Sequence, residues 1–418
     1  MLDFAQNKSS SGSLSNPSSP QYKAVEWLAQ DMVDNGSTWR GYELLQQYVL
    51  RVLYHSTRGE GWSEGIGPFD ASDTWFGASR VCDWGSTNAQ CNGNGQIVDH
   101  IELWDSHLKG TLPSELGHLT ALTYLDLFSN QLDGSIPSEL GELTALTFFD
   151  VDRNGGLTGD IPTQFGRLTA LTYFDLSENE LDGTIPFELI QLTALTHLAL
   201  YDNLLTGVIP DKLGQFTALR RLWLDRNQLD GTVPVGLGQL TALTNIDLFD
   251  NLLTGTIPSQ LGQLTALTYL EFWSNRLTGT IPSQLGQLTA LTLLALNENQ
   301  LTGTLPSQLG ELTALKESWI YQNLLTGTIP TQFGELTALT RLSLWQNQLT
   351  GRLPRTLTQL TRLKSLYLHF NNLTGQVPIG FCTAPFPDWR ADDDGSDENQ
   401  FWADCMSEVQ CSCCDGCA

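Results

Sequence analysis

The chain has 418 residues and a formal net charge of −25, from 46 acidic and 21 basic residues. Such an acidic surface disfavours nucleic acids and anionic membranes as partners. No stretch approaches the roughly 18 apolar residues that cross a bilayer, so no membrane span is expected in this chain.

The N-terminal part is predicted to contain a disordered segment and then a helical cap. Residues 1–20 are rich in Ser, Asn and Pro, which predicts disorder, and they lack the apolar run of a signal peptide. Within residues 21–96, helices are expected over Tyr22–Met32 and Tyr42–His55. In the second helix an apolar stripe predicts the packed side. The polar residues lie opposite that stripe: Gln46, Gln47 and Arg51.

A phrase of about 24 residues repeats twelve times over residues 97–381, approximately L-T-A-L-T-x-L-x-L-x-x-N-x-L-T-G-T-I-P-x-x-L-G-x. A period of this length predicts a solenoid that is stabilised by the stacking of neighbouring coils. The alternating leucines predict one short strand per coil, and the strands of successive coils should pair in parallel about 4.8 Å apart.

Most strands are followed by an asparagine, which eleven of the twelve coils contain, whereas the first has Ser106. An inward amide can satisfy backbone groups of neighbouring coils that would otherwise be buried unpaired. The glycine a few residues later, such as Gly255, suits a backbone with positive φ. The x-x-L-G stretch predicts a helical turn. A one-residue insertion at 152–156 lengthens one coil, and it is either a tolerated insertion or a bulge that shapes a site.

Eight cysteines lie outside the repeats, two before them and six after them. This distribution predicts disulfide-stapled caps, with a Cys-rich C-terminal cap over residues 382–418, and an oxidising compartment. Zinc binding by the run of cysteines from Cys405 to Cys417, in which Cys414 and Cys417 have ligand spacing, is the alternative. The missing signal peptide conflicts with this prediction; we give the cysteines more weight and expect an extracellular or cell-surface protein. The disulfide candidates are Cys82, Cys91, Cys382, Cys405, Cys411, Cys413, Cys414 and Cys417, and the glycosylation candidates are Asn7, Asn35 and Asn372.

The extension L-T-G-x-I-P after the asparagine resembles the plant-type class of leucine-rich repeats. Cys82-Asp83-Trp84 with Cys91 is similar to the N-terminal cap of that class, and the repeated L-T-A-L-T and the segment Tyr22–Leu28 are most similar to algal receptor-like proteins. The resemblance implies an α/β solenoid with a parallel sheet on its concave face and a cap at each end. It also implies ligand recognition and a co-receptor, although the chain has no kinase motifs.

The outward residues of the strands are the candidate ligand-binding site, because an aromatic stripe exposed on a sheet usually marks an interaction surface. The alternative is that these rings stack on one another and stabilise the sheet. An acidic stripe on the same face would favour a basic ligand. The ligand-binding candidates are Tyr201, Trp223, Phe249, Glu271, Trp273, Trp319, Tyr321, Trp345 and Tyr367, and the acidic stripe is Asp126, Asp150, Asp175 and Asp247.

No catalytic motif is present, so the chain is not expected to be an enzyme, and no cofactor or metal is predicted. The acidic segment 391–398 departs from an EF-hand in its glycine and its last glutamate and is interpreted as a solvated loop. The favoured function is recognition of a protein, peptide or carbohydrate by the ectodomain-like part of a receptor-like protein. Inhibition of cell-wall hydrolases is the alternative, and ice binding by a threonine ladder (Thr256, Thr280, Thr304 and Thr328) is a third hypothesis.

Overall fold

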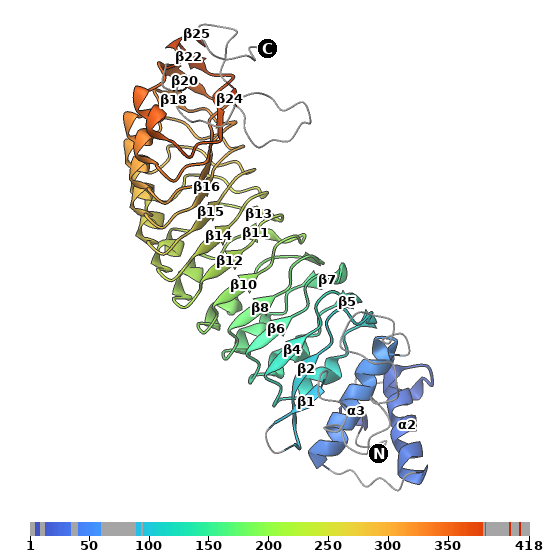
Figure 1. Ribbon diagram of the computed structural model, residues 1–418. Coiled ribbons are helices and arrows are strands. Elements are labelled where there is room, and N and C mark those ends of the chain that lie inside the picture. Colours follow the sequence, from blue (N-terminus) through green and yellow to red (C-terminus); the bar gives the residue numbers. More distant parts are fainter. Residues whose placement is uncertain are drawn as a thin grey trace. The chain divides into compact units, whose positions relative to one another are not determined.

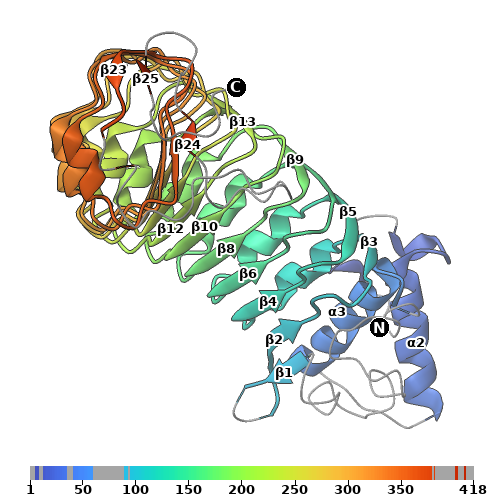
Figure 2. The ribbon, with the colours of Figure 1, turned by 45° about the horizontal axis from the view of Figure 1, so that its top comes forward.

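The computed structural model describes residues 5–8, 13–34, 41–59, 89–92, 95–378, 381, 401–402 and 409–410. The chain forms two compact units, Met1–Thr206 and Gly207–Ala418. Both units consist of the repeated coil, and two helices precede the coils of the first unit (Figures 1 and 2).

The two helices are confirmed as α2 (Pro20–Asp34) and α3 (Gly41–Ser56). Helix α3 packs against α2 and also contacts the first coil, at β3 (Lys109–Thr111) and η4 (Ser114–His118). Figure 1 shows α3 between α2 and the first coils. The apolar end of the first coil is therefore covered.

The expectation that α3 has an open polar side is wrong, because Gln46, Gln47 and Arg51 are all buried. The Gln46 amide donates to the Gln96 carbonyl at 3.1 Å and accepts from the backbone N–H of Val98, so it pairs with the edge of the first coil. The Arg51 guanidinium lies 3.5 Å from the centre of the Trp27 ring. A helix that is covered on two sides has polar residues in its interface, and each needs a partner there.

Part of the N-terminal segment expected to be disordered has regular structure. A 3-10 helix, η1, forms over Ser13–Ser15. The Ser19 hydroxyl accepts the backbone N–H of Tyr22 at 3.1 Å and so caps the start of α2. The expectation therefore does not hold for residues 13–20.

In the first unit each coil contributes one strand to a main sheet, in which β1 is antiparallel to β2 and the other strands are parallel. A second parallel sheet and a row of 3-10 helices complete the coils. The main strands are β1 (Ala89–Cys91), β2 (Val98–Glu102), β4 (Tyr124–Asp126), β6 (Phe148–Asp150), β8 (Tyr173–Asp175) and β10 (His197–Ala199). The second sheet is β3, β5 (Gln131–Ser135), β7 (Gly156–Asp160) and β9 (Glu180–Asp182), and the helices after η4 are η5 (Ser138–Glu142), η6 (Thr163–Arg167) and η7 (Phe187–Gln191).

The second unit repeats this arrangement with a parallel main sheet. Its main strands are β12 (Arg221–Trp223), β14 (Asn245–Asp247), β15 (Tyr269–Glu271), β16 (Leu293–Ala295), β17 (Glu317–Trp319), β19 (Arg341–Ser343), β21 (Ser365–Tyr367) and β24 (Phe401–Trp402). The minor strands are β11 (Thr206–Val208, at the boundary), β13 (Gln228–Asp230), β18 (Thr326–Gly327), β20 (Gln348–Gly351), β22 (Asn372–Leu373), β23 (Gly375–Gln376) and β25 (Val409–Gln410). The 3-10 helices are η8 (Asp211–Gln215), η9 (Val235–Gln239), η10 (Ser259–Gln263), η11 (Ser283–Gln287), η12 (Ser307–Glu311), η13 (Thr331–Glu335) and η14 (Arg355–Gln359).

The asparagines have the structural role that their period predicted. Asn251 is 6% exposed, its oxygen accepts the backbone N–H of Leu229 at 2.9 Å, and its nitrogen donates to the carbonyls of Leu224, Leu248 and Phe249. The residue before each asparagine has a φ between 49° and 56°, which turns the chain so that the amide points inward. Within each unit, these asparagines therefore bond one coil to the coil before it.

The threonines of the proposed ladder also have a role in coil stacking. The next coil has a glycine with positive φ beside each of them: a Cβ added to Gly279 would lie 2.7 Å from the methyl group of Thr256. The threonine methyl occupies the space that a side chain would need, so the ladder is explained by the packing of coils.

Candidate functional site

We call the strand face the set of side chains that lie six, four and two residues before each asparagine of the main sheets. All nine ligand-binding candidates on this face are half-buried. The acidic residues were expected to project into solvent, and this is wrong for Asp126, Asp150 and Asp175, which are only 8%, 8% and 3% exposed. Asp247 is half-buried.

A column of rings that the sequence analysis missed explains part of this burial. Tyr124, Phe148 and Tyr173 are the residues six before the asparagine in successive coils, and their rings are stacked with centroids 4.2 and 4.4 Å apart. The stack continues to His100. These rings stand beside the carboxylates, and aligning the repeat at this position would have identified them.

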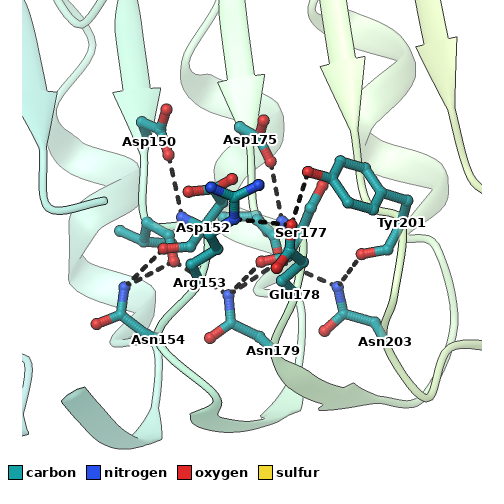
Figure 3. A network of polar contacts seen from close by, with 12 residues as sticks. Asp150, Asp152, Arg153, Asn154, Asp175, Ser177, Glu178, Asn179, Tyr201 and Asn203 are labelled. Carbon is teal, nitrogen blue, oxygen red and sulfur yellow. Dashed lines mark hydrogen bonds and ion pairs between the residues drawn. The ribbon is translucent and has the colours of Figure 1, made fainter. Parts of the chain in front are cut away.

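The acidic residues of the first unit have perturbed pKa values. Burial, with the Asp175 charge next, raises the pKa of Asp150 to about 8 and that of Asp152 to about 7. The pKa of Asp175 is raised by burial and partly restored by hydrogen bonds from Ser177 and Tyr173. Figure 3 shows these groups on two neighbouring coils. A basic partner is thus not required to explain the stripe, because part of it is protonated near neutral pH.

In the second unit several rings of the strand face stack on their neighbours. Phe249 and Trp273 are stacked with centroids 4.3 Å apart. Trp345 is stacked between Tyr321 at 4.8 Å and His369 at 5.2 Å. The sheet-stabilising interpretation of these rings is therefore supported, and their outer edges remain available to a ligand.

Trp319 is different from these stacked rings. Its partners in the register of the neighbouring strands are Ala295 and Ser343, which are small. Among the described residues no aromatic ring stacks on it. A half-buried indole between two small residues leaves its ring faces open to a ligand group.

Asp247 and Glu271 lie side by side on β14 and β15. Burial, followed by the charges of Glu271 and Asp225, raises the pKa of Asp247 to about 8. Burial also raises the pKa of Glu271, while a hydrogen bond from Trp273 lowers it. The folded protein therefore holds a proton on Asp247 that the unfolded chain would release at neutral pH.

We expect Asp247→Asn to make the free energy of unfolding less dependent on pH. Because the folded pKa of Asp247 is raised from an ordinary value of 3.8, its contribution to stability is full below about pH 4 and is lost as the pH rises to about 8. The wild type should lose at most about 1.4 kcal/mol more per pH unit than the variant in this window. Urea unfolding at pH 5 and pH 8 measures the difference. Asp250→Asn, at an exposed position, is the control, and equal pH slopes for wild type and Asp247→Asn would contradict the prediction.

Several predicted sites lie outside the described residues: Asn35, the segment 391–398 and all the cysteines except Cys91. Cys91 is in a disulfide, and its partner is outside the described residues too. Asn7 and Asn372 are exposed, as a glycan acceptor must be. In the described part of the chain, no helix has the length and apolar composition to cross a membrane.

The comparisons with known proteins agree with this architecture. The family described as Leucine Rich Repeat matches residues 121–143, 170–192, 218–240, 242–264 and 266–288, and a second leucine-rich repeat family matches residues 320–373. No curated protein sequence matches the chain significantly.

Three solved structures illustrate the likeness. The plant peptide hormone receptor RGFR1, in complex with RGF2, is 34% identical with a TM-score of 0.62 over 68% of this chain and 49% of the receptor. The ectodomain of the Arabidopsis receptor kinase HAESA, in complex with an IDA peptide hormone, is 33% identical with a TM-score of 0.67 over 79% of this chain and 54% of the other. The leucine-rich repeat protein LIC12759 of Leptospira interrogans is 31% identical with a TM-score of 0.51 over 67% and 74% of the two chains.

The coil, its asparagine ladder and these matches define a leucine-rich repeat solenoid. The chain belongs to the leucine-rich repeat family and to its plant-type class. It spans only about half the length of the two plant receptors.

Proposed function

We propose that this chain is a non-catalytic recognition module and that the strand face of the second unit binds an extended peptide segment. The observation that carries the proposal is Trp319, a half-buried indole without a stacking partner among the described residues, set between Ala295 and Ser343. Rigid aromatic side chains give a large contact area at a low entropic cost and dominate binding energies.

The side chains around Trp319 can form hydrogen bonds with the backbone of a peptide. Tyr321 and Trp345 of the adjoining column have polar atoms at the edges of their rings, and the Tyr321 hydroxyl donates a hydrogen bond to Glu298 at 3.3 Å. A side chain stacked on Trp319 would place the backbone of a ligand along this column. A ligand chain that crosses the strands in an extended form would pass one coil about every 4.8 Å, which is about one and a half residues.

Two relatives support a peptide as the ligand, because RGFR1 and HAESA are each described in complex with a peptide hormone. HAESA is also described in complex with the co-receptor SERK1. On the same ground, we propose that this chain binds a co-receptor. The likeness to ectodomains and the disulfide of Cys91 support an extracellular location. Signalling is part of this proposal, as is glycosylation of Asn372.

Replacing the indoles should weaken peptide binding strongly. The probe is the tightest linear peptide recovered on the full chain from a random display library. We expect Trp319→Ala to raise its Kd about 30-fold and Trp273→Ala/Trp319→Ala to raise it at least about 100-fold, since one aromatic hot spot contributes about 2 kcal/mol or more. Isothermal titration calorimetry measures the Kd.

The control is Phe187→Ala, which removes an aromatic side chain that is 55% exposed on η7, away from the strand face. Its Kd should equal that of the wild type. If the double variant binds the peptide with the same Kd as the wild type, the strand face is not the binding site. Enrichment of glycans on an array, without any peptide recovered from the library, would contradict the choice of ligand.

A further inference from the structure

Three carboxylates of the strand face converge in the first unit. One oxygen each of Asp150, Asp152 and Asp175 can be chosen so that all three lie within 4.8 Å of one another. Asp150 and Asp175 are register partners on β6 and β8, and Asp152 stands two residues beyond Asp150 (Figure 3). All three side chains are more than nine-tenths buried, at 8%, 7% and 3% exposed.

The contacts that these carboxylates already make orient them without neutralising them. Asp150 accepts the backbone N–H of Asp152 at 3.0 Å, and Asp175 accepts that of Ser177 at 2.9 Å. One oxygen of Asp152 has no hydrogen-bond partner. The nearest cation, Arg153, directs its Nε to Glu178 at 2.9 Å, so within the described residues none of the three carboxylates is in an ion pair.

A buried hydroxyl is the second, independent observation. Ser177 is 0% exposed, and no described group donates a hydrogen bond to its hydroxyl oxygen. The hydroxyl proton is directed at the Asp175 carboxylate and, like the backbone N–H of Ser177, lowers the pKa of that group. The lone pairs of a buried hydroxyl oxygen normally find a donor, because they lose the hydrogen bonds of water. A hydroxyl oxygen with unused lone pairs beside three converging carboxylates can act as a fourth ligand of a cation.

We propose that Asp150, Asp152 and Asp175, together with the Ser177 hydroxyl, form a site for a divalent cation, and that the cation is Ca²⁺. All four groups offer oxygen, the ligand atom that hard cations prefer. Ca²⁺ binds six to eight oxygens in a flexible geometry, whereas Mg²⁺ demands a near-ideal octahedron and usually keeps several waters. A buried set of three carboxylates and one hydroxyl, fixed by the backbone of two neighbouring coils, therefore suits Ca²⁺ better than Mg²⁺.

A divalent ion also suits this place better than the ammonium or guanidinium group of a ligand. Burial raises the pKa of all three carboxylates, and a doubly charged ion stabilises their ionised form more strongly than a singly charged group does. The Tyr173 hydroxyl donates to Asp175 at 3.2 Å, so it already occupies one side of this carboxylate. The site lies in the first unit, apart from Trp319 of the second unit, so it is independent of the proposed peptide face.

Calcium titration of the full chain tests the proposal. The chain is stripped with EDTA, dialysed and titrated with CaCl₂ in a calorimeter, and we expect one Ca²⁺ per chain with a Kd below about 1 mM, the range of extracellular calcium modules. Asp152→Asn and Asp175→Asn should each weaken binding at least about tenfold, and Ser177→Ala severalfold, because each removes one ligand. Mg²⁺ should bind at least about tenfold more weakly than Ca²⁺.

The control is Asp247→Asn, a carboxylate at the equivalent position of another coil with a similarly raised pKa, which should bind Ca²⁺ like the wild type. Terbium luminescence gives a second readout, because Tyr173 can sensitise Tb³⁺ held on Asp175, and Ca²⁺ should quench the emission by displacing it. Circular dichroism confirms that each variant is folded, and Ser177→Ala keeps all three carboxylates should an aspartate variant fail to fold. Absence of heat and of emission at about 5 mM ion, or equal binding by wild type and all ligand variants, would overturn the site.

Discussion

Replacing a single ladder asparagine should destabilise its unit severely. In Asn251→Ala, the buried N–H of Leu229 loses its acceptor, which costs about 1–3 kcal/mol. The carbonyls of Leu224 and Leu248 each lose one hydrogen bond but keep a second donor, from Asn227 and Asn275, so each of these losses costs about 0.5–1.5 kcal/mol. We expect the free energy of unfolding of the affected coils to fall by about 2–6 kcal/mol, measured by urea denaturation.

The control for this change is Asn245→Ala in the same coil. Asn245 is half-buried on the strand face, and its oxygen accepts only the hydroxyl of Thr244 at 2.9 Å. Its loss should cost less than about 1 kcal/mol. Because a solenoid unfolds in segments, hydrogen exchange at Leu229 and Leu253 should locate the effect of Asn251→Ala in its own and the adjoining coils. Similar denaturation midpoints for the two variants would show that the ladder does not hold the coils together.

The fold could be predicted from the sequence because its determinants recur at one period. The inward amide at Asn251, the positive φ at Gly255, which is 74°, and the turn that begins after Pro258 all follow from one residue type at one position. The asparagine recurs in eleven coils and the glycine and the proline in all twelve, so each position is interpreted from many copies. The two helices were predictable for a similar reason, since each has one apolar stripe.

The burial of the acidic residues could not be predicted from the strand period alone. Alternation places Asp150 outside the leucine core, but whether it meets water depends on the residues beside it. Its neighbours within the sheet are Asp126 and Asp175, and the ring of Phe148 stands in the adjoining column. An outward side chain in a parallel sheet is thus covered by the side chains at the same position of the neighbouring strands and by the adjoining column of rings. The alternation within one strand contains no information about these neighbours.

The polar side of α3 shows the same limit. A helical wheel places Gln46 and Arg51 opposite the apolar stripe, whereas the helix is enclosed by α2 and the first coil. Arg51 lies over the ring of Trp27, and both residues are visible in the sequence. No pattern in the sequence, however, predicts that these two side chains are in contact. Contacts between segments without a shared repeat carry no periodic signal.

Replacing one of the repeated glycines by alanine should disrupt the stacking of the 3-10 helices, because it adds a methyl group between neighbouring coils. A Cβ added to Gly262 in η10 would lie 2.4 Å from the carbonyl oxygen of Gln284 and 2.9 Å from its carbonyl carbon, both in the backbone of the next coil. Backbone cannot move aside as the end of a flexible side chain can, so the coils must separate locally. We expect Gly262→Ala to lower the free energy of unfolding by about 3 kcal/mol or more, measured by urea denaturation.

The repeats themselves support this reason for glycine. The 3-10 helices η4 to η14 have glycine at this position except in η7 and η14, where Ile190 and Thr358 replace it. Glycine is thus present in nine of these eleven helices. The exposed neighbour Gln263 is the control, and Gln263→Ala should change stability by less than about 0.5 kcal/mol. If Gly262→Ala unfolds at the same urea concentration as Gln263→Ala, the spacing between the two coils is not limited by backbone contact.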